Sequence, residues 1–192
     1  MKFLQHLLAA VLLFTSFAAY SQKEMPKGFA NGMIVLGNGD TLTGLLKDNI
    51  RKEAAVVFIS EAGGKKKTYQ GSGIMSAEIN DVRYLCIKGD FFKIVCEGNL
   101  CFLQKASDAS NIPTYNGTEA IFSNGTEGRP GDYFFYSATA KTLKMISGNT
   151  IEAVAVSSFA GCTAAIDKAK AVKSDFAQLK DAVEIYNNSN NK

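Results

Sequence analysis

Residues 91–103 read FFKIVCEGNLCFL, a stretch with the pattern of a β-hairpin. Two runs of alternating apolar residues flank Gly98 and Asn99, a pair that is typical of a two-residue hairpin turn. The stretch therefore predicts two antiparallel strands joined at this turn. In that register Ile94 and Leu103 lie on the same face of the sheet.

The same register brings Cys96 opposite Cys101, on a rung where Cα atoms lie about 4.5 Å apart. This separation suits a disulfide. The hairpin thus predicts a Cys96–Cys101 disulfide, with the equally supported alternative that both cysteines are small buried apolar residues. The other two cysteines, Cys86 and Cys162, receive no assigned role. The sequence contains no Cys-x-x-Cys redox pair.

Strand patterns continue toward the N-terminus. Asn38 and Gly39 mark a second hairpin turn, because both residues tolerate a positive φ. Closely spaced turn signals, with no helical periodicity between them, make residues 33–105 an antiparallel β meander or a partly rolled barrel. Further strands are expected at 54–60, 66–69, 75–79 and 83–87.

The pattern changes after this region. Residues 106–132 are rich in Ser, Asn, Gly, Thr and Pro, and they predict a long polar loop. The composition favours a disordered insertion over a functional loop. Tyr115, Phe122 and Tyr133 are aromatic residues in or beside this loop, and they are the candidate partner contacts.

Residues 133–187 contain one more stretch of strand character and then apolar residues at helical spacing. Ile151, Val154, Ala155 and Phe159 form the first helical stripe. We expect two to three C-terminal helices packed on the same domain, and a frayed tail at 188–192. The fold class predicted is therefore α+β.

The first 21 residues have the features of an export signal. A lysine at position 2 precedes an apolar run at 7–19, and small residues occupy 19 and 21. The alternative, an uncleaved membrane anchor, would need about 20 apolar residues. No cysteine precedes Cys86, so a lipoprotein is not expected. The sequence predicts a signal peptide at 1–21, a polar entry segment at 22–32, and release into the periplasm or the extracellular space.

The single histidine, His6, falls within this signal. The mature chain is then unable to use Ser-His-Asp or Cys-His catalysis, or a histidine-ligated metal. The net charge of +3 is too small for a nucleic-acid footprint. With 46% hydrophobic and 20% charged residues, the composition suits one packed globular core. No catalytic, cofactor-binding or metal-binding residue is assigned, and no segment after the signal predicts a membrane span.

Several stretches, taken in order, carry a family resemblance: GDTLTG at 39–44, VVFI at 56–59, KIVCEGNL at 93–100 and EIYN at 184–187. Together they make the chain similar to a broad group of uncharacterised secreted proteins of Bacteroidetes-type bacteria. The resemblance covers most of the mature chain outside 106–132. It implies export and a β-rich fold, and it implies no activity or site.

Three classes of function remain after these exclusions. The leading one is a non-catalytic cell-envelope or secreted module that binds an envelope protein or a surface polymer. The first alternative is a glycan hydrolase that depends on a pair of carboxylates. The second is a carrier that holds a small apolar ligand inside the rolled sheet.

Overall fold

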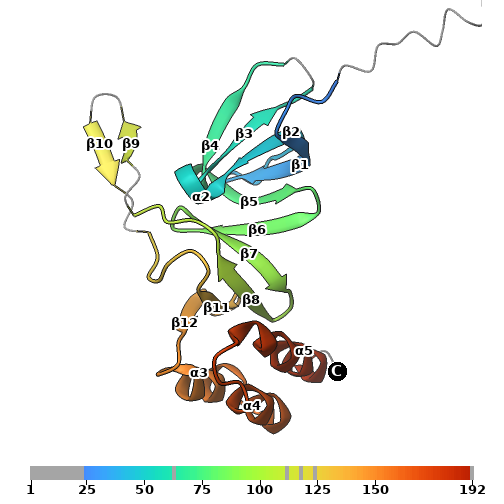
Figure 1. Ribbon diagram of the computed structural model, residues 1–192, viewed down its shortest axis with the longest axis vertical. Helices are drawn as coiled ribbons and strands as arrows, with labels where there is room; N and C mark the ends of the chain where they lie inside the picture. Colours follow the sequence, from blue (N-terminus) through green and yellow to red (C-terminus); the bar gives the residue numbers. More distant parts are fainter. Residues whose placement is uncertain (1–23, 62–63, 111–112, 117–118, 123–124, 191–192) are drawn as a thin grey trace, which may run out of the picture.

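The computed structural model describes residues 24–61, 64–110, 113–116, 119–122 and 125–190, with the backbone alone for the strands between 113 and 122. The expected signal peptide at 1–21 lies outside these residues. The fold is α+β, as predicted: a ten-stranded antiparallel sheet is followed by C-terminal helices (Figure 1).

The strands follow one another in the sheet as β12-β11-β8-β7-β6-β5-β1-β2-β3-β4, so β12 and β4 form its two edges. The sheet is open, and a closed barrel is not formed. Its strands are β1 (Phe29–Leu36), β2 (Thr41–Asn49), β3 (Ala55–Ile59), β4 (Lys67–Gln70), β5 (Ile74–Ile79), β6 (Val82–Ile87), β7 (Asp90–Cys96), β8 (Leu100–Lys105), β11 (Tyr133–Ser137) and β12 (Thr142–Ile146).

The remaining elements are short helices and one separate hairpin. Strand β1 begins at Phe29, so the expected entry segment already contributes its last residues to the sheet. Helix α5 continues to Asn190, so residues 188–190 extend a helix where a frayed tail was expected. The elements are α2 (Ile50–Glu53), α3 (Ile151–Ser158), α4 (Thr163–Lys170), α5 (Leu179–Asn190), the 3-10 turns η2 (Gly71–Gly73) and η3 (Phe176–Gln178), and the paired strands β9 (Pro113–Asn116) and β10 (Glu119–Phe122).

The order of strands departs from a simple meander at β1, which lies between β2 and β5. In a flat sheet the four strand intervals from β4 to β5 would span about 19 Å. The chain makes this connection through the three residues of η2, which reach only about 14 Å. The sheet must therefore curl at this end, so that β4 ends close to the beginning of β5.

The inside of this curl is filled by apolar side chains. Ile34 and Leu46 are fully buried there, whereas Met33 and Lys47, which point to the opposite face, are exposed. The periodicity of two in the sequence thus corresponds to an inner and an outer face. The inner cluster also contains Ile50, Ala54, Val56, Phe58, Ile74, Ala77, Ile79, Phe91 and Ala109.

The C-terminal helices α3, α4 and α5 cover one face of the other half of the sheet (Figure 1). Phe135 of β11 packs edge-on against Phe159, with ring centroids 5.1 Å apart. Small residues such as Ala165 and Ala182 are fully buried and allow close packing of the helices. The expected two to three C-terminal helices are therefore confirmed, as α3, α4 and α5. Within the residues that the structure describes, no helix is both long and apolar enough to cross a membrane.

The opposite face of this half carries a third cluster, built on Phe92, Leu103 and Phe134. The segment 125–132 runs over part of it. At Gly128, where φ is +79°, a Cβ atom would meet both Met145 and Phe134. The last part of the expected loop, residues 125–132, is therefore packed on the sheet, because this glycine lets its backbone approach Phe134 and Met145 closely.

Candidate functional site

A buried ion pair joins the ends of β7 and β8, the two strands of the hairpin expected from residues 91–103. Asp90 is the first residue of β7 and Lys105 is the last residue of β8. The Lys105 Nζ lies 3.1 Å from Asp90 Oδ2, and neither side chain is exposed to solvent. Because an isolated buried charge is strongly disfavoured, the two groups must be held together and also satisfied by other partners.

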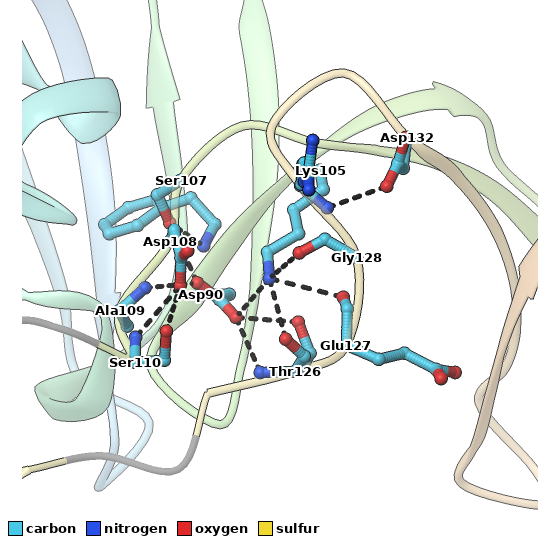
Figure 2. A network of polar contacts seen from close by, with 12 residues as sticks. Asp90, Lys105, Ser107, Asp108, Ala109, Ser110, Thr126, Glu127, Gly128 and Asp132 are labelled. Carbon is cyan, nitrogen blue, oxygen red and sulfur yellow. Dashed lines mark hydrogen bonds and ion pairs between the residues drawn. The ribbon is translucent and has the colours of Figure 1, made fainter.

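The Asp90 carboxylate collects donors from both ends of the 106–132 segment (Figure 2). On one side, the Ala109 N–H donates to Oδ1 at 2.7 Å, and the Ser107 hydroxyl makes a longer contact of 3.4 Å with the same atom. On the other side, Thr126 donates to Oδ2 from its N–H at 2.8 Å and from its hydroxyl at 2.6 Å. One carboxylate thus binds both ends of this segment. We call these ends its two legs: the first contains Ser107 and Ala109, and the second contains Thr126.

The Lys105 side chain holds the second leg only. Its ammonium group donates to the carbonyl oxygens of Thr126, Glu127 and Gly128 at 2.8, 3.3 and 3.1 Å (Figure 2). The Lys105 main chain adds bonds in both directions, because its N–H donates to the Asp132 carbonyl and its carbonyl accepts from Gly131, each at 2.8 Å. We call the network of Asp90, Lys105 and these partners the latch.

The bonds of the latch hold segments of the chain together, and its charged groups are not placed as those of an active site would be. Its carboxylate is surrounded by hydrogen-bond donors and its ammonium by acceptors, so the polar atoms of both groups are engaged inside the protein. A general acid or base needs to exchange a proton with a substrate, and both groups here are fully buried. No group of three or more His, Cys, Asp or Glu among the described residues is placed to hold a metal ion.

Between the two legs, β9 and β10 form a two-stranded sheet of their own. The expected loop at 106–132 is therefore not a structureless insertion: its legs are fastened and its middle is a hairpin. Figure 1 shows this hairpin standing away from the ten-stranded sheet. In its register Tyr115 pairs with Ala120 and Phe122 pairs with Pro113, so positions 115 and 122 belong to the same face of the hairpin.

The third candidate contact, Tyr133, lies elsewhere. It begins β11, and its half-buried ring stacks on Phe102 with centroids 5.1 Å apart and planes inclined by 17°. This places Tyr133 beside the helix-covered core and separates it from the hairpin. The YFFY pattern at 133–136 did not reveal this, because both faces of β11 carry aromatic residues.

The cysteine hairpin differs from its expected register by one bulge. Ile94 pairs with Leu103, but the register then shifts, and Cys96 lies opposite Phe102 instead of Cys101. The expected Cys96–Cys101 rung is therefore wrong. All four cysteines are free thiols in the structure. Burial raises the pKa of the Cys96 and Cys101 thiols, which lowers the fraction of reactive thiolate.

A residue that the sequence pattern did not single out binds the turn that follows this bulge. Asn187 of α5 accepts a hydrogen bond from the Leu100 N–H and donates to the Leu100 carbonyl, both at 3.0 Å. It also donates to the Glu97 carbonyl at 3.3 Å. The Leu100 N–H and the Glu97 carbonyl were expected to face each other across the two-residue turn. Both are bonded to the Asn187 side chain of α5. Gly98 is required there, because a Cβ atom would overlap the Asn187 side chain.

The sequence pattern also did not predict that Asp90 and Lys105 form a buried pair. Asp90 follows a glycine in a turn-like stretch, where an acid is ordinarily solvated. Lys105 ends an apolar strand, where lysine is ordinarily exposed. Nothing local distinguishes a buried pair from two surface charges.

Comparison of the chain with protein-family models, with curated proteins and with solved structures gives no match.

Proposed function

We propose that this protein is an exported, non-catalytic binding module of the cell envelope or the extracellular space, and that it contacts its partner through the β9–β10 hairpin. The latch is the observation that carries this proposal. A fully buried ion pair fastens the base of a hairpin that stands apart from the main sheet. Export rests on the signal features of residues 1–21.

The energetics of the hairpin favour a binding role. A two-stranded sheet by itself is marginally stable in water. Here its two legs are held by four contacts to Asp90 and three carbonyl bonds to Lys105. Fixing the base reduces the conformational entropy that the hairpin loses when it binds. Loops held on a rigid scaffold are common places for recognition.

Two aromatic positions give the hairpin a contact face. Positions 115 and 122 belong to one face of the two-stranded sheet. They come from two successive pairs on that face, 115 with 120 and 113 with 122, and they are diagonal neighbours. Tyr and Phe are enriched at interfaces between proteins. An envelope protein or a surface polymer is the expected partner.

The other two classes of function receive less support. The inner face of the curled sheet is occupied by large side chains such as Leu46, Phe58 and Phe91, and this filling does not favour the carrier hypothesis. The buried carboxylate Asp90 is bonded within the latch, so it does not serve the hydrolase hypothesis.

Photo-crosslinking in the native cell tests the proposal. A photoreactive amino acid would replace Tyr115 or Phe122 in turn, and Met75, which is 52% exposed in β5, would be the matched control position. We expect the same specific adduct from 115 and 122 and none from 75. A partner that crosslinks equally from all three positions, or that is still captured after residues 113–122 are replaced by a Gly-Ser linker, would refute the role of the hairpin.

A further inference from the structure

A concave site lies where the C-terminal helices meet the sheet, and it includes no residue of the latch. It has a volume of about 350 Å³, which is within the range of small-ligand pockets. Three strands and two helices contribute to it. Its lining residues are Asn99, Leu100, Phe135, Ser137, Ala140, Thr142, Lys144, Ser157, Ser158 and Tyr186.

The lining combines an apolar floor with hydroxyl groups. Leu100 and Phe135 are buried members of the helix-covered core, at 5% and 2% exposure. Above them the lining is mostly hydroxyl-bearing residues from β11, β12, α3 and α5: Ser137, Thr142, Ser157, Ser158 and Tyr186. The pocket therefore offers many neutral hydrogen-bonding groups over an apolar surface.

Lys144 is the only charged residue in this lining, and no acidic residue belongs to it. Its ammonium group donates to the Ser157 hydroxyl at 3.0 Å, and that hydroxyl donates to the Val154 carbonyl at 3.1 Å. Ser157 lies in the last turn of α3, where the helix dipole favours a positive charge. No carboxylate forms an ion pair with Lys144 among the residues that the structure describes.

The geometry of the pocket is fixed by the same core that holds the helices. Phe135, Phe159 and Tyr186 form a chain of aromatic contacts, with successive centroids 5.1 and 5.5 Å apart. Asn187, next to Tyr186, is bonded to Leu100 in the floor. The strands and α5 are therefore held together on both sides of the pocket before any ligand enters.

We propose that this pocket binds a small polyhydroxylated anion, specifically an acidic sugar unit with a carboxylate. The carboxylate would pair with the Lys144 ammonium, for which the described residues supply no anionic partner. The sugar hydroxyls would exchange hydrogen bonds with the serine, threonine and tyrosine hydroxyls, and its C–H face would rest against the aromatic ring of Tyr186. This site is independent of the hairpin, and its ligand does not depend on the proposed function.

A titration of the purified protein, followed by two-dimensional NMR of its backbone amides, tests the ligand class. D-glucuronate is the probe, glucose is the control without the charge, and acetate is the control without the hydroxyls. We expect saturable shifts around the lining residues with glucuronate, and binding at least about tenfold weaker with each control, because a charged hydrogen bond and several neutral ones are lost in turn. Equal responses to glucuronate and acetate, or no saturable response to glucuronate, would overturn the proposal.

Variants then assign the site to Lys144. Lys144→Gln should weaken glucuronate binding by about tenfold or more, and Lys144→Arg, which keeps the charge, should retain most of it. Lys141→Gln is the matched control, since Lys141 is exposed in the β11–β12 turn and outside the lining. A loss that is the same for Lys141→Gln and Lys144→Gln would show nonspecific charge attraction and refute the site. Replacing hairpin residues 113–122 should leave glucuronate binding unchanged, which separates this proposal from the one above.

Discussion

The Asn187 side chain binds both main-chain polar groups of Leu100, each at 3.0 Å, across 87 positions of sequence. The Asn187 amide therefore satisfies the N–H and the carbonyl of the first residue of β8, as a neighbouring strand would. Because Asn187 is only 5% exposed, water is unable to replace it easily. This contact joins α5, the last helix, to the β7–β8 hairpin.

Replacing Asn187 by Ala should lower the free energy of unfolding by about 2 kcal/mol, because the buried Leu100 N–H and carbonyl lose their partner. Urea unfolding followed by circular dichroism measures this. The matched control is Asn190→Ala, an exposed position of the same helix, which should change stability by less than about 0.5 kcal/mol. Equal losses from the two variants would contradict the role assigned to Asn187.

Substitution of Gly98 by Ala should also destabilise the protein, by more than about 1 kcal/mol, because its Cβ would overlap the Asn187 side chain and its φ is +156°. In the Asn187→Ala background the same change should cost less, since the overlap is removed. A double-mutant cycle measures this coupling. Gly148→Ala is the control, because a Cβ there meets no atom within 4 Å. Strict additivity of the two changes would argue against direct contact.

Breaking the latch should have a larger effect. Lys105→Met leaves the Asp90 carboxylate buried without its cation, and we expect a loss of about 3–5 kcal/mol. The exposed pair of Lys168 and Asp181 provides the comparison, since Lys168→Ala should cost at most about 1 kcal/mol.

Hydrogen exchange distinguishes a local from a global effect of the same Lys105→Met variant. The amides of Ala109 and Thr126 donate directly to Asp90, so their protection should fall with the latch. Unchanged protection at both amides would mean that the carboxylate holds the two legs without help from the lysine.

Acid stability should reflect Asp108. Hydrogen bonds from the Ser110 hydroxyl and N–H lower the pKa of this carboxyl. A carboxyl whose pKa is lower in the folded protein stabilises the fold above its unfolded pKa of about 3.9, and this contribution is lost as pH falls through the lower folded value. The Tm of the wild type should therefore fall more steeply than that of Asp108→Asn between about pH 4 and pH 2. Parallel curves would show that these bonds do not favour the ionised form.

Peptide mapping without reductant addresses the cysteines. The bulge places Cys96 opposite Phe102, so the folded hairpin does not present the paired rung on which the disulfide prediction was based. We expect alkylation of the unfolded, unreduced protein to label Cys96 and Cys101 separately. A linked pair of these cysteines would show that the hairpin closes in the register without the bulge.

The features that depend on local patterns were predictable from the amino-acid sequence. The alternation at 91–103 predicts β7, β8 and the pairing of Ile94 with Leu103, because the side chains of a strand alternate between two faces. The spacing from Ile151 to Phe159 predicts α3, because residues three and four apart share one face of a helix. Both patterns are complete within a few residues, so no distant contact is needed to interpret them.

Contacts between groups far apart in sequence became known only from the folded protein. Asn187 displaces the expected turn at Gly98, and Asp90 gathers donors from Ala109 and Thr126, which lie on both legs of a segment that composition alone marks as disordered. Lys105 is buried because the carbonyls of that segment cover it. These outcomes depend on hydrogen bonds between residues far apart in sequence, and a buried polar group carries no local signal of the partner that will satisfy it.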